Sequence, residues 1–249
     1  MKSIERAQKE LKKLLQGNRN FVNGTPTTKN MTLETLQKYA FHQEPYACVL
    51  TCSDSRVVPE IIFDCGIGEL FVARVAGMTT GPNVVESVEY AVKKLEVPLL
   101  ILLGHDDCGV MKYAIEHYNK ASKISTISAQ RVKNDYTNAE KAVPISTQGV
   151  KNDYTNAEKT VPVSTQRVKN PELMSNFSSI LKCVYPVLDK KEEIVNGKKC
   201  HNFFAQEHTR WVEDYLMKHS VIINEAVKND KLLIAKCHFN HETGLVELI

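Results

Sequence analysis

The chain has 249 residues, of which 43% are hydrophobic and 24% are charged, a balance typical of a globular protein with a sizeable core. The formal net charge is only +3 and the lysines are dispersed among acidic residues, so the charge does not favour binding to nucleic acid. No apolar stretch approaches the ~18 residues of a membrane span, and the N-terminus lacks the apolar core of a signal peptide.

The first half of the chain alternates helical and strand patterns. In chain order it is predicted to form helices at 3–22 and 33–41, a strand at 46–52, a helical turn at 60–63, a strand at 69–76, a helix from Pro82 to Leu95, a strand at 98–103 and a helix that opens at 109–118. The strand at 98–103 is apolar throughout, which is typical of a strand covered on both faces.

The second half continues the alternation. Helices are predicted at 176–188, where Pro186 bends or ends the helix, and at 203–219. A strand is predicted at 232–239, and after a turn at 243–244 the last residues, 245–249, pair back as an antiparallel edge strand. The fold class is therefore α/β, with a mostly parallel sheet flanked by helices and an antiparallel strand at the C-terminus. We expect a single domain over 1–249, with an N-terminal helical arm at 1–44.

A tandem repeat lies within an expected insertion at about 118–170. Residues 131–148 and 149–166 are identical at 15 of 18 positions. Two copies fall below the roughly three that a self-supporting solenoid needs. We interpret the repeat as a duplication in a surface loop, because added loop length costs little entropy. Contact with a partner or with another subunit is the alternative.

The seven cysteines point to reduced thiols. An odd number at irregular spacing does not resemble a disulfide framework, and we expect a cytoplasmic protein. Five of them are interpreted as small buried hydrophobic residues: Cys48, Cys65, Cys183, Cys200 and Cys237.

Two polar clusters follow two of the predicted strands. One reads Cys52-Ser53-Asp54-Ser55-Arg56 and the other His105-Asp106-Asp107-Cys108-Gly109. Neighbouring parallel strands end at the same edge of a sheet, so both clusters are expected to meet there. Two thiolates and one imidazole form a zinc site with a fourth position left open.

The other residues of the clusters receive roles around that site. Asp54 and Arg56, two residues apart, are expected to form an ion pair beside the metal. Asp106 and Asp107 are interpreted as acids that complement the dipole of the following helix, whose positive end favours the thiolate form of the cysteines.

Together the two clusters resemble the signature of the β-class carbonic anhydrases. Further similar segments lie at 15–22, 59–64, 68–77, 207–210 and 243–246. The resemblance implies reversible hydration of carbon dioxide to bicarbonate and a proton, with Zn2+ held by Cys52, His105 and Cys108. It also implies two states for Asp54: paired with Arg56, or bound to zinc as a fourth ligand that blocks catalysis.

Family resemblance also sets expectations for the surroundings of the metal and for assembly. Ser53 and Ser55 are expected to donate hydrogen bonds near the ligands, and Gly104 and Gly109 to allow close backbone approach. A homodimer or homotetramer is implied, with the N-terminal helix packed on the partner subunit and no nucleic acid or membrane as partner. The sequence departs from the family pattern at Cys65, Met78 and Phe239, which affects substrate positioning and proton exit but not the metal ligands.

Two alternative functions stay open. A related enzyme of the same fold hydrolyses carbon disulfide or carbonyl sulfide, which requires a narrow apolar entrance. The other alternative is a non-catalytic zinc-binding scaffold that uses the repeat as its interaction surface. Asp54 and Arg56 argue against the scaffold, because a purely structural zinc site usually closes with a fourth Cys or His.

Overall fold

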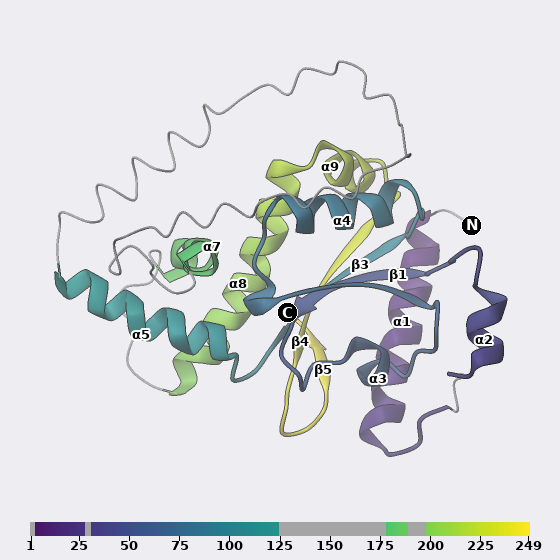
Figure 1. Cartoon of the computed structure of the whole chain (residues 1–249), viewed down its shortest axis with the longest axis horizontal. Coiled ribbons are helices and arrows are strands. Elements are labelled where there is room, and N and C mark those ends of the chain that lie inside the picture. The colour runs from purple at the N-terminus through teal and green to yellow at the C-terminus, as the bar shows by residue number, and fades with distance from the viewer. Residues whose placement is uncertain (1–2, 28–30, 125–177, 189–197) are drawn as a thin grey trace, which may run out of the picture. The chain divides into compact units, whose positions relative to one another are not determined.

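The computed structural model describes residues 3–27, 31–124, 178–188 and 198–249 (Figure 1). The chain divides into two compact units, one formed by residues 1–119 and 179–249 and the other by residues 120–178. Nearly all of the second unit, including the repeat at 131–166, lies outside the described residues, and the side chain of Cys200 is not described either. In the described part of the chain, no helix is long and apolar enough to cross a membrane.

Five strands of the first unit form one sheet in the order β2-β1-β3-β4-β5. The strands are β1 (Ala47–Cys52), β2 (Leu70–Val75), β3 (Leu99–His105), β4 (Leu233–Phe239) and β5 (Val246–Leu248). The first four run parallel, and β5 pairs antiparallel with β4. All residues of β1 and β3 are buried, as expected for central strands covered on both faces. The predicted fold class is confirmed.

Helices cover the two faces of this sheet (Figure 1). The described helices are α1 (Ser3–Val22), α2 (Leu33–Lys38), α3 (Pro59–Ile62), α4 (Pro82–Lys93), α5 (Gly109–Ile124), α7 (Ser178–Leu188), α8 (Lys198–His219) and α9 (Val221–Lys228), with a 3-10 turn η1 at Ala76–Met78. Side chains alternate along each strand, so Val49 and Ile101 pack toward α1 while Leu50 and Leu102 pack toward α4, α8 and α9.

Several boundaries differ from the sequence-based expectation. Helix α2 ends at Lys38 rather than near residue 41, and α9 was not predicted at all. Ser220 explains α9, because its hydroxyl accepts a hydrogen bond from the Ile223 amide (3.0 Å) and starts a new helix directly after α8. Strand β3 extends to His105 instead of ending at residue 103, because Gly104 and His105 continue the ladder with β4.

The N-terminal helix packs on the sheet of its own chain. Ala7 and Leu14 of α1 are fully buried in the core on that face of the sheet. Gly17 lies so close to α3 that a Cβ there would stand 1.9 Å from the Phe63 carbonyl oxygen. The next residue, Asn18, has a buried side-chain amide. This amide donates to the carbonyls of Ile62 (3.2 Å) and Gly244 (2.8 Å) and accepts from the Val246 backbone amide (2.8 Å).

Replacement of Asn18 by alanine tests this connection between α1, α3 and the C-terminal hairpin. The change leaves buried backbone groups without partners, so we expect the free energy of unfolding to fall by about 3 kcal/mol. Urea unfolding followed by circular dichroism measures it. Gln16→Ala is the matched control, because it removes an exposed amide of the same helix, and an equal loss in both variants would contradict the role of Asn18.

Candidate metal centre

The side chains of Cys52, His105 and Cys108 converge at the carboxyl edge of the sheet. Cys52 is the last residue of β1, His105 is the last residue of β3, and Cys108 directly precedes α5. Their ligand atoms all lie within 4.8 Å of one another, and all three residues are buried. The structure thus brings together the three residues that the sequence predicts as metal ligands.

His105 is oriented as a metal-binding imidazole should be. Its Nδ1 lies 2.7 Å from the carbonyl oxygen of Asp106. A carbonyl oxygen only accepts hydrogen bonds, so Nδ1 carries the proton and Nε2 keeps a free lone pair. This buried Nε2 has no hydrogen-bond partner in the described part of the chain. Hydrogen bonding of one ring nitrogen to a carbonyl while the other binds the ion is the usual arrangement of metal-bound histidine, so the residue fits a metal.

Of the two thiols, that of Cys52 is the more acidic. Cys52 Sγ accepts hydrogen bonds from the amides of Gly77 (3.2 Å) and Asp54 (3.4 Å). The Cys108 thiol and these contacts lower the pKa of Cys52 to about 4. The hydrogen bond to Cys52, with burial, raises the pKa of Cys108 well above its usual value. A divalent cation bound by both sulfurs would favour the thiolate form of each cysteine.

Asp54 is held by Arg56 and is not part of the ligand cluster. Arg56 Nε donates to Asp54 Oδ1 (2.9 Å), Arg56 Nη2 donates to Oδ2 (2.8 Å), and the Arg56 amide also donates to Oδ1 (3.0 Å). These bonds hold the pKa of the Asp54 carboxyl well below its usual range. Arg56 Nη2 also reaches the carbonyl of Asp107 (3.3 Å), whose carboxylate pairs with Lys112. The predicted ion pair therefore exists, and it bridges the two clusters.

A carbonic anhydrase family model matches residues 47–177, a little more than half of the chain. This chain belongs to the β-class carbonic anhydrases. It is 44% identical over 108 residues to carbonic anhydrase 2 of Mycobacterium tuberculosis, which is 43% of this chain and 52% of that protein. It is 46% identical over 101 residues to the carbonic anhydrase of Mycolicibacterium smegmatis, which is 41% of this chain and 49% of that protein. The matched region thus spans about half the length of these relatives.

Solved structures of β-carbonic anhydrases share the fold. A tetrameric enzyme from Sordaria macrospora superposes with a TM-score of 0.57 at 20% identity, covering 87% of this chain and 86% of its own. An enzyme from Aspergillus fumigatus gives a TM-score of 0.58 at 15% identity, covering 87% and 80%. At these identities the comparison supports the architecture of the sheet and helices.

The smaller predicted site residues of this β-carbonic anhydrase chain differ in their surroundings. Ser53 and Ser55 are exposed, and neither hydroxyl has a hydrogen-bond partner among the described residues, so the expected donors to the ligands are not seen. Gly104 does allow a close approach, since a Cβ there would lie 2.5 Å from Thr209 Oγ1 of α8. Among the residues that the structure describes, a Cβ at Gly109 would meet no heavy atom within 4 Å, so the close approach expected there is not seen.

Two further residues belong to the site and were not assigned to it from sequence. Arg74 of β2 donates to the carbonyls of Cys52 (3.2 Å) and Asp54 (2.7 Å) and so fixes the backbone of the first cluster. His208 of α8 lines the same small pocket as the three ligands. It is almost completely buried, and burial lowers its pKa to about 4. A histidine on the inner face of a helix gives no local signal of this position.

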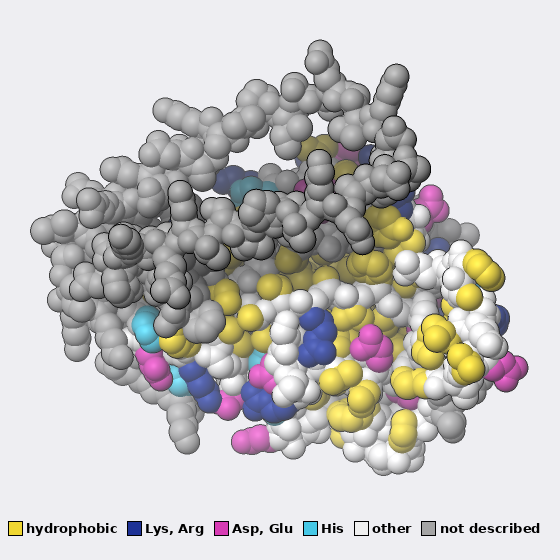
Figure 2. All heavy atoms as spheres, in the orientation of Figure 1, with side chains coloured by type: hydrophobic (Ala, Val, Ile, Leu, Met, Phe, Trp, Pro, Cys, Tyr) yellow, Lys and Arg dark blue, Asp and Glu magenta, His cyan; other side chains and the backbone are white. Residues whose placement is uncertain are grey.

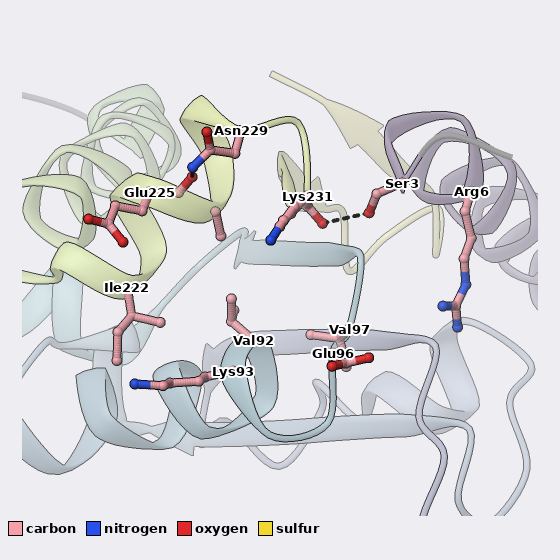
Figure 3. A pocket seen from close by; sticks show the side chains of 11 residues that line it. Ser3, Arg6, Val92, Lys93, Glu96, Val97, Ile222, Glu225, Asn229 and Lys231 are labelled. Atoms are coloured by element: carbon pink, nitrogen blue, oxygen red, sulfur yellow. Dashed lines mark hydrogen bonds between the residues drawn. The ribbon is translucent and has the colours of Figure 1, made fainter.

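A second, wider groove lies away from the metal centre, between α1, α4 and α9 (Figure 3). Its rim carries exposed cations and anions, among them Arg6, Glu96 and Lys231, and Ser3 Oγ donates to the Lys231 carbonyl (2.8 Å). None of the predicted site residues lines this groove.

Replacement of Cys108 by serine tests the ligand set. A serine hydroxyl is a poor replacement for a thiolate, so we expect the purified protein to drop from about one zinc ion per chain to a small fraction of that. Mass spectrometry of the metal content measures the change. Cys183→Ser is the control, because this thiol lies outside the cluster and donates only to the Thr80 carbonyl. Full zinc occupancy in Cys108→Ser would rule out the proposed ligand set.

Proposed function

We propose that this protein catalyses the reversible hydration of carbon dioxide to bicarbonate and a proton, with zinc held by Cys52, His105 and Cys108. The observation that carries the proposal is the position of an ionised Asp54, held by Arg56, next to three buried ligand atoms that leave one coordination position open. A closed structural zinc site would have no use for this ion pair. Membership of the β-class carbonic anhydrases supports the same reaction.

Zinc bound to these residues supplies a Lewis acid that makes water nucleophilic near neutral pH. The side chains of Asp54 and Arg56 would orient this water. Asp54 Oδ1 accepts two hydrogen bonds from Arg56, whereas Oδ2 accepts one and keeps a lone pair. That lone pair could accept a hydrogen bond from the water that the metal would activate, and it would orient this water for attack on carbon dioxide. Met78, Leu103 and Met111 line the small pocket beside the three ligands and give it apolar walls.

The same ion pair sets whether the site is open. With Asp54 held on Arg56, as in this structure, a fourth position of bound zinc would be left to water. Release of Asp54 from Arg56 and its binding to zinc is the closed alternative. Three hydrogen bonds from Arg56 and the contact of Arg56 with Asp107 favour the open state.

The expected assembly is a homodimer or a homotetramer. Strand β2 lies at one edge of the sheet, and its apolar residues Leu70, Phe71 and Val72 are only half buried. Helix α2 has no buried residue, and Leu33, Leu36 and Phe41 in and after it are exposed. Hydrophobic side chains are visible over this face of the molecule (Figure 2). A second copy of the chain would cover these apolar side chains.

Stopped-flow measurement of carbon dioxide hydration, with zinc determined on the same sample, tests the proposed reaction. We expect zinc-dependent turnover at alkaline pH, and stoichiometric zinc without turnover would refute the proposal. Carbon disulfide and carbonyl sulfide are assayed in parallel, because hydrolysis of either without carbon dioxide hydration would identify the related hydrolase instead.

Replacement of Asp54 by asparagine tests the orienting carboxylate. The amide keeps the shape but loses the charge, so we expect normal zinc content with a loss of about 100-fold or more in kcat/KM. Asp214→Asn removes an exposed carboxylate of α8 and serves as the matched control. Full activity of Asp54→Asn would show that this residue has no role in the reaction.

Light scattering after size-exclusion chromatography tests the assembly. We expect a mass that is two or four times the 28.1 kDa of the chain. A mass of one chain throughout the micromolar range would contradict the proposed oligomer.

A further inference from the structure

Asp106 lies in the sequence between the candidate ligands His105 and Cys108. Its side chain is hydrogen-bonded to a histidine of another strand. His238 Nε2 of β4 is 2.7 Å from Asp106 Oδ1, and the side chains are only 7% and 13% exposed. An ionised carboxylate only accepts hydrogen bonds, so His238 is the donor. This contact replaces the role expected for Asp106 from sequence, that of an acid placed to complement the dipole of α5.

The backbone of Asp106 is held as firmly as its side chain. Its amide donates to the carbonyl of Phe239 (3.0 Å), which continues the pairing of β3 with β4 beyond His105. Its carbonyl oxygen receives the hydrogen bond from His105 Nδ1. All three polar groups of Asp106 therefore have partners, and one of those partners is a metal ligand.

These contacts form a continuous path from β4 to the ligand. His238 holds the Asp106 carboxylate, the Asp106 carbonyl holds Nδ1 of His105, and Nδ1 sets the direction of the free Nε2. Cys108 follows Asp106 by two residues, so a shift of this turn would move both ligands. The neighbouring Asp107 shows a contrast, because it has the same side chain but is exposed and pairs with Lys112.

We propose that His238 and Asp106 are positioning residues that orient His105 and the 105–108 turn before the metal binds. The proposal rests on the metal centre of the proposed function, but not on the reaction carried out there. Groups that hydrogen-bond to metal ligands typically change metal affinity by 10- to 100-fold when removed. We expect an effect of that size from His238 although it touches no metal ligand itself.

Two substitutions of His238 separate positioning from packing. His238→Leu fills the site without a donor, whereas His238→Gln places an amide Nε2 at about the reach of the lost ring nitrogen. Zinc affinity is measured by competition with a chelator, and the ligand geometry by the absorption bands of the cobalt-substituted protein. We expect 10- to 100-fold weaker zinc binding and shifted cobalt bands for His238→Leu, and values within about threefold of the parent protein for His238→Gln.

A third variant and a control distinguish an effect on the metal ligands from a general loss of stability. Asp106→Ala removes the carboxylate and is expected to behave like His238→Leu. Lys236→Met removes a different ion pair of β4, with Glu213 of α8, and is expected to leave zinc affinity and the cobalt bands unchanged. Thermal unfolding of each metal-free variant shows which of them are folded.

The metal-free protein supplies a readout that does not depend on metal or activity. Nitrogen-15 correlation spectra of the histidine rings report which nitrogen carries the proton. We expect His105 to be protonated on Nδ1 in the parent protein and in His238→Gln, and to lose this preference in His238→Leu. Unchanged His105 spectra and zinc affinity in folded His238→Leu or Asp106→Ala would overturn the proposal. Failure of the parent protein to bind zinc would refute the proposed metal centre, while the ring spectra would still decide whether His238 orients His105.

Discussion

The register between β1 and β3 is the constraint on which the candidate site depends. Thr51 pairs with Leu103, and its hydroxyl donates to the Leu103 carbonyl (2.7 Å) inside the sheet. The next residue of β1 is Cys52, and the next two residues of β3 are Gly104 and His105. A slip by one residue would turn every side chain of a strand to the opposite face. The two buried apolar strands therefore do more than form a core, because their alignment places a sulfur and an imidazole at the same point.

Unpaired polar atoms gather around that point. Among the described residues, the buried side-chain nitrogen and oxygen atoms without a hydrogen-bond partner are Thr80 Oγ1 and ring nitrogens of His105, His208, His238 and His241. His105 and His208 line one pocket, the ring of His241 lies 5.0 Å from that of His105, and His238 holds the turn between the ligands. Folded proteins rarely leave such groups unsatisfied. Their concentration is expected where a metal ion and water complete the hydrogen bonding and coordination.

Sequence patterns predict the parts of this site that are local. Cys52, Asp54 and Arg56 form one short segment after an apolar strand, so their chemistry and their place at the sheet edge could be predicted together. The contacts of Asp106 with His238 and of Arg74 with the Cys52 carbonyl join residues that are far apart in the chain. No periodicity or spacing reports such contacts, because they arise only when β4 and β2 take their places in the sheet. Helix α9 was missed for a different reason, since its break from α8 depends on the single cap at Ser220.

The helices on either side of the repeat both pack beside the candidate site. Helix α5 precedes the repeat and α7 follows it, and both contribute to one apolar cluster with Cys52 and Cys108. Met111 and Ile115 on α5 and Val184 and Leu188 on α7 are buried there. Packing between these helices fixes the two ends of the connection, whatever its length. Each doubling of a flexible connection costs only about 0.6 kcal/mol of closure entropy. For a repeat that forms a surface loop, as expected from the sequence, a second copy of 18 residues would therefore add little to the cost of folding.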